Sequence, residues 1–159
     1  MSRAEFLRSV DLFRGLGPDQ LAKLEAVMQP VEYREGEGIF NERAEGQHLF
    51  VIESGVVEIF RTIEGEERTT RLARLGAGEI FGELSVLDGK PRAASARAAI
   101  DPITHLLVIS KRDFERVLAE NPALAATLLR GIVVKLADRM RRLDDAVHHL
   151  SRAMAYGSY

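Results

Sequence analysis

The stretch LGAGEIFGELSVLDGKPRAAS, residues 75–95, decides the fold of this chain. An apolar run ends at Phe81 and is followed by Gly82, a residue that lets another group approach the backbone closely. Residues 83–87 have enough length for one helical turn before Asp88 and Gly89 reverse the chain. The sequence therefore predicts a strand, a single turn of helix and a tight reversal at this point.

The same stretch carries side chains that suit a phosphate and a sugar. The first N–H groups of a helical turn have no partner in the helix and attract anions. Arg92, followed by the small residues Ala93 and Ala94, adds a planar guanidinium that matches phosphate geometry. Glu83, when ionised, only accepts hydrogen bonds and can receive them from a sugar hydroxyl. Phosphate donors beside a hydroxyl acceptor indicate a nucleotide site.

Two motifs in this stretch, FGE at residues 81–83 and PRAAS at residues 91–95, occur in this order and spacing. Together they resemble the phosphate-binding cassette of the cyclic nucleotide-binding domain family, of the type found in the catabolite activator and the protein kinase A regulatory subunit. Every signature position of that cassette is filled. Motif matches are hypotheses that a structure must support.

The resemblance implies a role for each cassette residue. It implies that Arg92 grips the cyclic phosphate, that backbone groups at Gly82, Ser85 and Ala93 share it, and that Glu83 accepts from the ribose 2′-hydroxyl. The ligand so implied is cAMP, with cGMP as the weaker alternative, because Ala93 carries no hydroxyl to meet the guanine amino group. No metal is implied.

The resemblance extends beyond the cassette, from about residue 6 to about residue 150. Residues 12–16 (LFRGL) are similar to the family's entry segment, residues 33–37 (YREGE) to its first β-turn, and residues 49–55 (LFVIESG) to its strand-turn-strand. Residues 43–47 (RAEGQ) depart from the family, which commonly has a glycine near the second position and an acidic residue near the fifth. We expect this turn, and not the ligand site, to differ.

The periodicity of apolar residues divides the chain into three zones of one domain, residues 1–159. Residues 1–30 show helical spacing and predict two short helices. Residues 31–110 contain short β-branched runs between turn signals and predict antiparallel strands. Residues 111–159 return to helical spacing with one break at Pro122. The predicted fold is α+β: a jelly-roll-like β-roll flanked by N-terminal helices and a long C-terminal helix.

The nucleotide base is expected to lie between the strand before the cassette and the last helix. The members of this base pocket are predicted to be Leu72, Ala73, Leu75, Lys135, Leu136 and Arg139. The chain has no Trp to cap the base.

A heptad repeat on the last helix, residues 129–154, predicts a coiled-coil seam and a parallel homodimer. Leucine recurs every seven residues along this helix, and a valine or methionine recurs every seven residues between the leucines. The seam residues are Leu129, Val133, Leu136, Met140, Leu143, Val147 and Leu150, and Met154 continues the pattern. Arg139 of one chain can meet Asp144 of the other.

Composition restricts the remaining possibilities. The 159 residues carry a net charge of −2 and no Cys, which favours a cytoplasmic protein without disulfides or thiolate metal sites. No apolar stretch is long enough for a membrane span. The four His residues contain no i,i+4 pair, so neither a metal site nor a metal-dependent phosphodiesterase is predicted. About nine residues follow Leu150, too few for a helix-turn-helix, so we expect no DNA contact.

The sequence thus predicts a stand-alone sensor that binds cAMP without catalysis. Its C-terminal helices are expected to change on binding and to act on an unknown effector protein in trans. Two alternatives stay open: a sensor domain excised from a larger transcription regulator, channel or kinase, and a degenerate domain that has lost its ligand. The presence of both Glu83 and Arg92 argues against the second.

Overall fold

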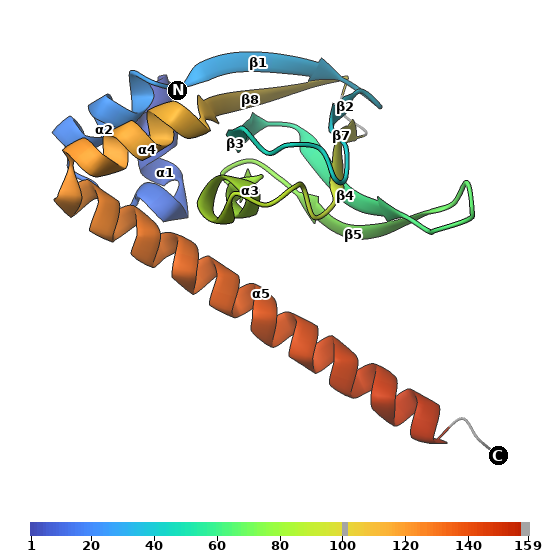
Figure 1. The fold of residues 1–159 in the computed structure, drawn as a ribbon. Helices are drawn as coiled ribbons and strands as arrows, with labels where there is room; N and C mark the ends of the chain where they lie inside the picture. Colours follow the sequence, from blue (N-terminus) through green and yellow to red (C-terminus); the bar gives the residue numbers. More distant parts are fainter. Residues whose placement is uncertain (100–101, 157–159) are drawn as a thin grey trace.

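A computed structural model describes residues 1–99 and 102–156 of the chain. It contains two four-stranded antiparallel sheets that form a β-roll, with helices at one end and one long helix, α5, running beneath it (Figure 1). The predicted α+β class and the β-roll are therefore confirmed. Residues 157–159 of the predicted C-terminal zone lie outside the described residues.

The eight strands fall into two sheets, ordered β1-β8-β3-β6 and β2-β7-β4-β5. Their bounds are β1 Gln29–Arg34, β2 Gly38–Phe40, β3 His48–Ser54, β4 Val56–Thr62, β5 Thr69–Leu75, β6 Ile80–Phe81, β7 Ser95–Ala99 and β8 Ile103–Ser110. The pairing of Phe50 with Phe81 joins β3 to β6 and fixes where the cassette begins. The pairing of Phe60 with Ser95 joins β4 to β7 and fixes where it ends.

The helices begin and end where local sequence signals predict. Their bounds are α1 Arg3–Ser9, the 3-10 helix η1 Asp11–Phe13, α2 Pro18–Glu25, α3 Glu83–Asp88, α4 Lys111–Glu120 and α5 Pro122–Tyr156. Ser2 and Glu5 form a capping box on α1, and Pro18 occupies the first turn of α2. The Ser110 hydroxyl accepts from the Asp113 N–H at the start of α4. Asn121 ends α4, because Pro122 disfavours helical geometry at the residue before it.

Two apolar clusters hold the fold together. The first packs the helices against one face of the β1-β8-β3-β6 sheet and includes Leu24, Leu49 and Leu128. The second lies between the two sheets, where the Phe50 and Phe81 rings stack at 4.9 Å. Cassette residues therefore take part in both clusters, since Val86 of α3 belongs to the first.

Helix α5 contacts the rest of the domain along its N-terminal half, from the apolar core to the ion pair between Arg139 and Glu83. Leu124, Leu128 and Ile132 are buried in the first cluster. A Cβ added at Gly131 would lie 2.7 Å from a methyl group of Leu12, so η1 and α5 pack closely at this point. The rest of the helix extends away from the β-roll (Figure 1). Within the described residues, no helix is both long and apolar enough to span a bilayer.

Candidate functional site

The cassette is shaped by two glycines in left-handed conformations. Gly82 has φ 77° just before α3, and Gly89 has φ 70° just after it. A Cβ at Gly82 would lie 2.8 Å from Nη1 of Arg92 and 3.0 Å from the His48 carbonyl oxygen. Any other residue at 82 would thus be strained and would collide with the site. The predicted single turn of helix is confirmed, with bounds Glu83–Asp88.

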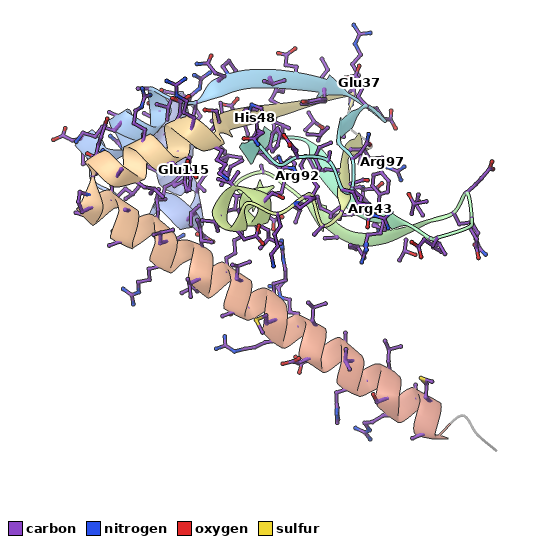
Figure 2. The ribbon with its side chains drawn as sticks, viewed as in Figure 1. Glu37, Arg43, His48, Arg92, Arg97 and Glu115 are labelled. Atoms are coloured by element: carbon purple, nitrogen blue, oxygen red, sulfur yellow. The ribbon has the colours of Figure 1, made fainter. Side chains whose placement is uncertain are left out.

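Arg92 is buried inside the β-roll, beside His48 (Figure 2). Its side chain is held from two sides: Nη1 donates to the Gly82 carbonyl at 2.8 Å and Nη2 to the His48 carbonyl at 2.7 Å. The guanidinium also stacks on the Phe40 ring, 4.1 Å from its centre. Two backbone carbonyls therefore hold the Arg92 guanidinium in place.

One N–H of this buried cation is unused. The Nε of Arg92 is buried and has no hydrogen-bond partner among the described residues. The whole residue is only 5% exposed. Burial lowers the pKa of the Arg92 guanidinium, and the negative charge of Glu83 opposes that shift. A buried donor without a partner is costly unless something binds it. The guanidinium is therefore fixed in orientation by its two Nη groups and keeps one N–H donor that no described residue accepts.

Glu83 is the second buried charged group, with 4% of its surface exposed. It begins α3, and its Oε1 lies 3.4 Å from Nη1 of Arg139 on α5. The predicted ribose acceptor is thus paired across the site with the long helix. Arg139, which the sequence predicted to lie in the base pocket, forms an ion pair with Glu83 in the structure.

These groups line a cavity of about 1560 Å³ between the β-roll, α3, η1 and α5. Most of the predicted site residues border it. They are Leu72, Ala73, Leu75, Gly82, Glu83, Ser85, Arg92, Ala93, Lys135 and Arg139. Leu136 is the exception: it packs against the first apolar cluster and does not line the cavity. The placement of Leu136 in the base pocket is therefore not supported.

Helix α5 contributes more of this cavity than the sequence prediction included. Arg130, Val134, Asp138 and Arg142 also line it. Asp138 lies three residues after Lys135 and Arg142 three after Arg139, and the four residues follow one another at intervals of four, so helical spacing could have identified them. Burial lowers the pKa of Lys135, and the carboxylates of Glu79 and Glu83 oppose the shift.

The apolar side chains of α3 are covered unequally. Val86 is buried in the first apolar cluster. Leu84 and Leu87 remain 39% and 40% exposed. Only one face of this single turn therefore contacts the core, and Leu84 lines the cavity instead.

The turn that departs from the family pattern, residues 43–47, places a non-glycine residue in a left-handed conformation. Among the described residues, Arg43 is the one non-glycine with a positive φ, 68°. The family's glycine was expected near Ala44, one residue away. The turn thus has its left-handed residue one position before the expected glycine.

Residues 1–99 and 102–156 contain no group of three or more His, Asp or Glu side chains placed to hold a metal ion. The site is defined by one buried arginine and one buried glutamate at the wall of a cavity. A β-roll carrying that pair defines a ligand-binding domain. Residues 30–121 match the family described as the cyclic nucleotide-binding domain. The chain belongs to this family.

Named relatives agree with this assignment. The "Cyclic AMP receptor protein" of Thermus thermophilus is 38% identical over 139 residues, which cover 87% of this chain and 61% of that protein. A "cAMP-dependent protein kinase regulatory subunit" of Mycosarcoma maydis is 33% identical over 117 residues, covering 72% of this chain and 22% of its own length. A crystal structure of a cyclic nucleotide-binding domain from Methylobacillus flagellatus has a TM-score of 0.78 at 28% identity, covering 91% of this chain and 79% of that one.

The chain spans about 60% of the length of its curated bacterial relatives. The expectations of a stand-alone domain and of no DNA contact therefore stay predictions.

Proposed function

We propose that this domain is a sensor that binds a 3′,5′-cyclic nucleotide without transforming it. One observation carries the proposal: the buried charged residues Arg92 and Glu83 line the same cavity, and Nε of Arg92 has no hydrogen-bond partner among the described residues. In the bound complex Arg92 holds the cyclic phosphate, and backbone N–H groups around Gly82, Ser85 and Ala93 share it. Glu83 accepts from the ribose 2′-hydroxyl. Calorimetric titration with cAMP, set against 5′-AMP, tests this assignment.

Helix α5 forms the opposite wall and meets the base. Lys135 and Arg139 reach the cavity from it, facing Leu72, Ala73 and Leu75 at the end of β5. A base placed between these two walls would join the roll to the helix.

We expect cAMP to bind more tightly than cGMP. Ala93 lines the cavity but has no hydroxyl to satisfy the guanine amino group. The names of the Thermus and Mycosarcoma relatives point to the same ligand. A neutral hydrogen bond contributes about 0.5–1.5 kcal/mol. Ala93→Thr should therefore reduce the ratio of cAMP affinity to cGMP affinity by roughly twofold to tenfold.

The control for this change is Ala93→Val, which has the shape of threonine without its hydroxyl. It should leave the ratio of the two affinities unchanged. Competition titration measures both ratios, and a tighter constant for cGMP in the native protein would refute the preference.

Nucleotide binding is proposed to shift the helices after β8, and the Glu83–Arg139 ion pair supplies the connection. In the proposed complex, the ribose hydroxyl and Arg139 both donate to the Glu83 carboxylate. Nucleotide binding therefore changes the contact between α5 and α3. Asn121 marks the hinge, and its side chain accepts from Lys23 and donates to the Val117 carbonyl. The ligand moves this equilibrium by its difference in affinity between the two states.

Hydrogen exchange with and without cAMP checks this switch. We expect changed protection across residues 111–150 in the native protein and a smaller change in Arg139→Gln. The matched control is Arg141→Gln, because Arg141 is paired with Asp138 on the same helix and does not line the cavity. Changes confined to residues 81–95 would mean a static binder.

The sensor is proposed to act as a parallel homodimer on an effector protein in trans. The exposed heptad side chains of α5 beyond Ile132 support the dimer, because several of them are at least 60% exposed. These are Val133, Met140, Leu143, Val147, Leu150 and Met154. Leu129 is 38% exposed, whereas Leu136 is partly buried against its own domain. A pull-down with and without cAMP would identify the effector.

A further inference from the structure

The turn between β2 and β3, residues 41–47, holds the backbone of Arg92. The Arg43 N–H donates to the Arg92 carbonyl at 2.8 Å, and the Arg92 N–H donates to the Ala44 carbonyl at 2.8 Å. A Cβ at Gly46 would lie 2.0 Å from Cβ of Ser85 and 3.2 Å from Cζ of Arg92. The turn therefore touches both the guanidinium and α3, and its position determines where Arg92 stands.

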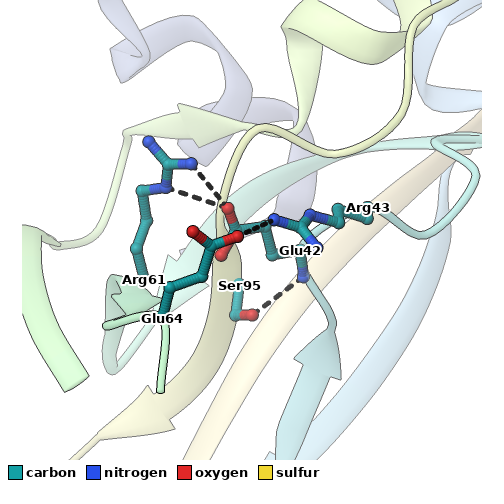
Figure 3. A network of polar contacts seen from close by, with 5 residues as sticks. All are labelled: Glu42, Arg43, Arg61, Glu64 and Ser95. Atoms are coloured by element: carbon teal, nitrogen blue, oxygen red, sulfur yellow. Dashed lines mark hydrogen bonds and ion pairs between the residues drawn. The ribbon is translucent and has the colours of Figure 1, made fainter. Parts of the chain in front are cut away.

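The turn is itself fixed by Glu42 (Figure 3). The Glu42 N–H donates to the Ser95 hydroxyl at 2.8 Å. Its carboxylate oxygen accepts from Nε and Nη2 of Arg61 on β4, at 2.9 and 2.8 Å. The Glu42 side chain is 17% exposed and that of Arg61 is 56% exposed, so water screens this pair less than a pair in which both groups are fully exposed.

A second ion pair in the same view is weaker. Nη2 of Arg43 lies 3.3 Å from Glu64, and the two side chains are 77% and 91% exposed. A single, longer contact between exposed groups contributes little. The two pairs join the same turn to the same hairpin, and they differ in geometry and burial.

We propose that the Glu42–Arg61 ion pair is a positioning element for Arg92. It fixes the 42–44 turn, whose two backbone hydrogen bonds set the place of the guanidinium. Its effect on ligand affinity rests on the proposed function, in which Arg92 binds the cyclic phosphate. Glu42 does not line the cavity, whereas Arg61 does, so direct contact between Arg61 and the ligand is the rival explanation.

Three variants separate the two explanations. If the pair positions Arg92, then Glu42→Gln and Arg61→Gln should each weaken cAMP binding by about threefold to tenfold, and the double variant should be no weaker than either. If Arg61 binds the ligand directly, Arg61→Gln alone weakens binding and Glu42→Gln leaves it unchanged or improves it, which overturns the proposal. The control, Glu64→Gln, should bind like the native protein.

A second measurement needs no nucleotide. The Nε–H resonance of Arg92 reports the surroundings of the guanidinium, and thermal melting of each variant checks that it is folded. Glu42→Gln should shift that resonance while Glu64→Gln leaves it in place. An unshifted resonance in folded Glu42→Gln refutes the positioning role. If instead the resonance shifts but native protein does not bind cAMP, the proposed ligand is wrong and the positioning role stands.

Discussion

Arg92→Ala should weaken cAMP binding by about one to two decades. A hydrogen bond to a charged group contributes about 1.5–3 kcal/mol, and 1.4 kcal/mol corresponds to a tenfold change. The loss has a second source, because Arg92 also donates to the Gly82 and His48 carbonyls, which would be left without these donors. Calorimetry measures the affinity, and undiminished binding would refute the site.

The matched control for this change is Arg97→Gln. Arg97 lies on β7, five positions beyond Arg92, and pairs with Glu58, with its side chain 40% exposed. It does not line the cavity, so its loss should leave cAMP affinity within about twofold of the native value, as for a change remote from the site. Thermal melting of both variants shows whether either has lost its fold.

The ribose contact can be tested separately with a modified ligand. Native protein should bind 2′-deoxy-cAMP more weakly than cAMP, because Glu83 loses its hydroxyl partner. Glu83→Gln should weaken cAMP binding and should discriminate less between the two ligands. A variant that still prefers cAMP as strongly as native protein would place the 2′-hydroxyl elsewhere.

Replacing Leu143 and Leu150 together by Asp should convert a dimer into a monomer. These leucines are 60% and 64% exposed in the protomer, and a parallel seam would bury four of them in the dimer. Burial of a leucine contributes about 1.5–3 kcal/mol, so the dissociation constant of the dimer should rise by roughly four decades or more. Leu136 is a poor choice here, since it packs on its own domain.

Light scattering over a range of concentrations measures this change. Arg152→Asp is the control, because position 152 falls outside the heptad seam. It introduces the same side chain on the outer face of α5 and should leave the dimer intact. A native protein that is monomeric at high micromolar concentration would contradict the seam.

The sequence predicted the parts of the site that depend on local signals. The FGE and PRAAS motifs located Glu83 and Arg92, and the single helical turn between Gly82 and Gly89 followed from residue types alone. The break at Pro122 and the heptad repeat on α5 were likewise predicted from residue types close together in the sequence. Each of these depends on residues close together in the chain.

The parts that could not be predicted depend on contacts between distant residues. Arg92 donates to His48, 44 positions away, and Glu83 pairs with Arg139, 56 positions away. Leu136 satisfied a heptad pattern that does not distinguish a partner helix from the core of the same domain. The left-handed conformation of Arg43 could likewise not be predicted from the sequence, because tertiary hydrogen bonds override the preference for glycine there.

The length of α5 gives the domain a mechanical property. Its 35 residues make a rod of about 52 Å, and the apolar core of the domain packs against the first part of it, as far as Leu136. A rotation of about 5° at the Asn121 hinge would carry its far end through roughly 4–5 Å, close to one full helical pitch. If nucleotide binding moves this hinge as proposed, the helix acts as a lever arm: a small rotation beside the cavity becomes a displacement close to the rise of about 5 Å between neighbouring a and d positions of the heptad repeat.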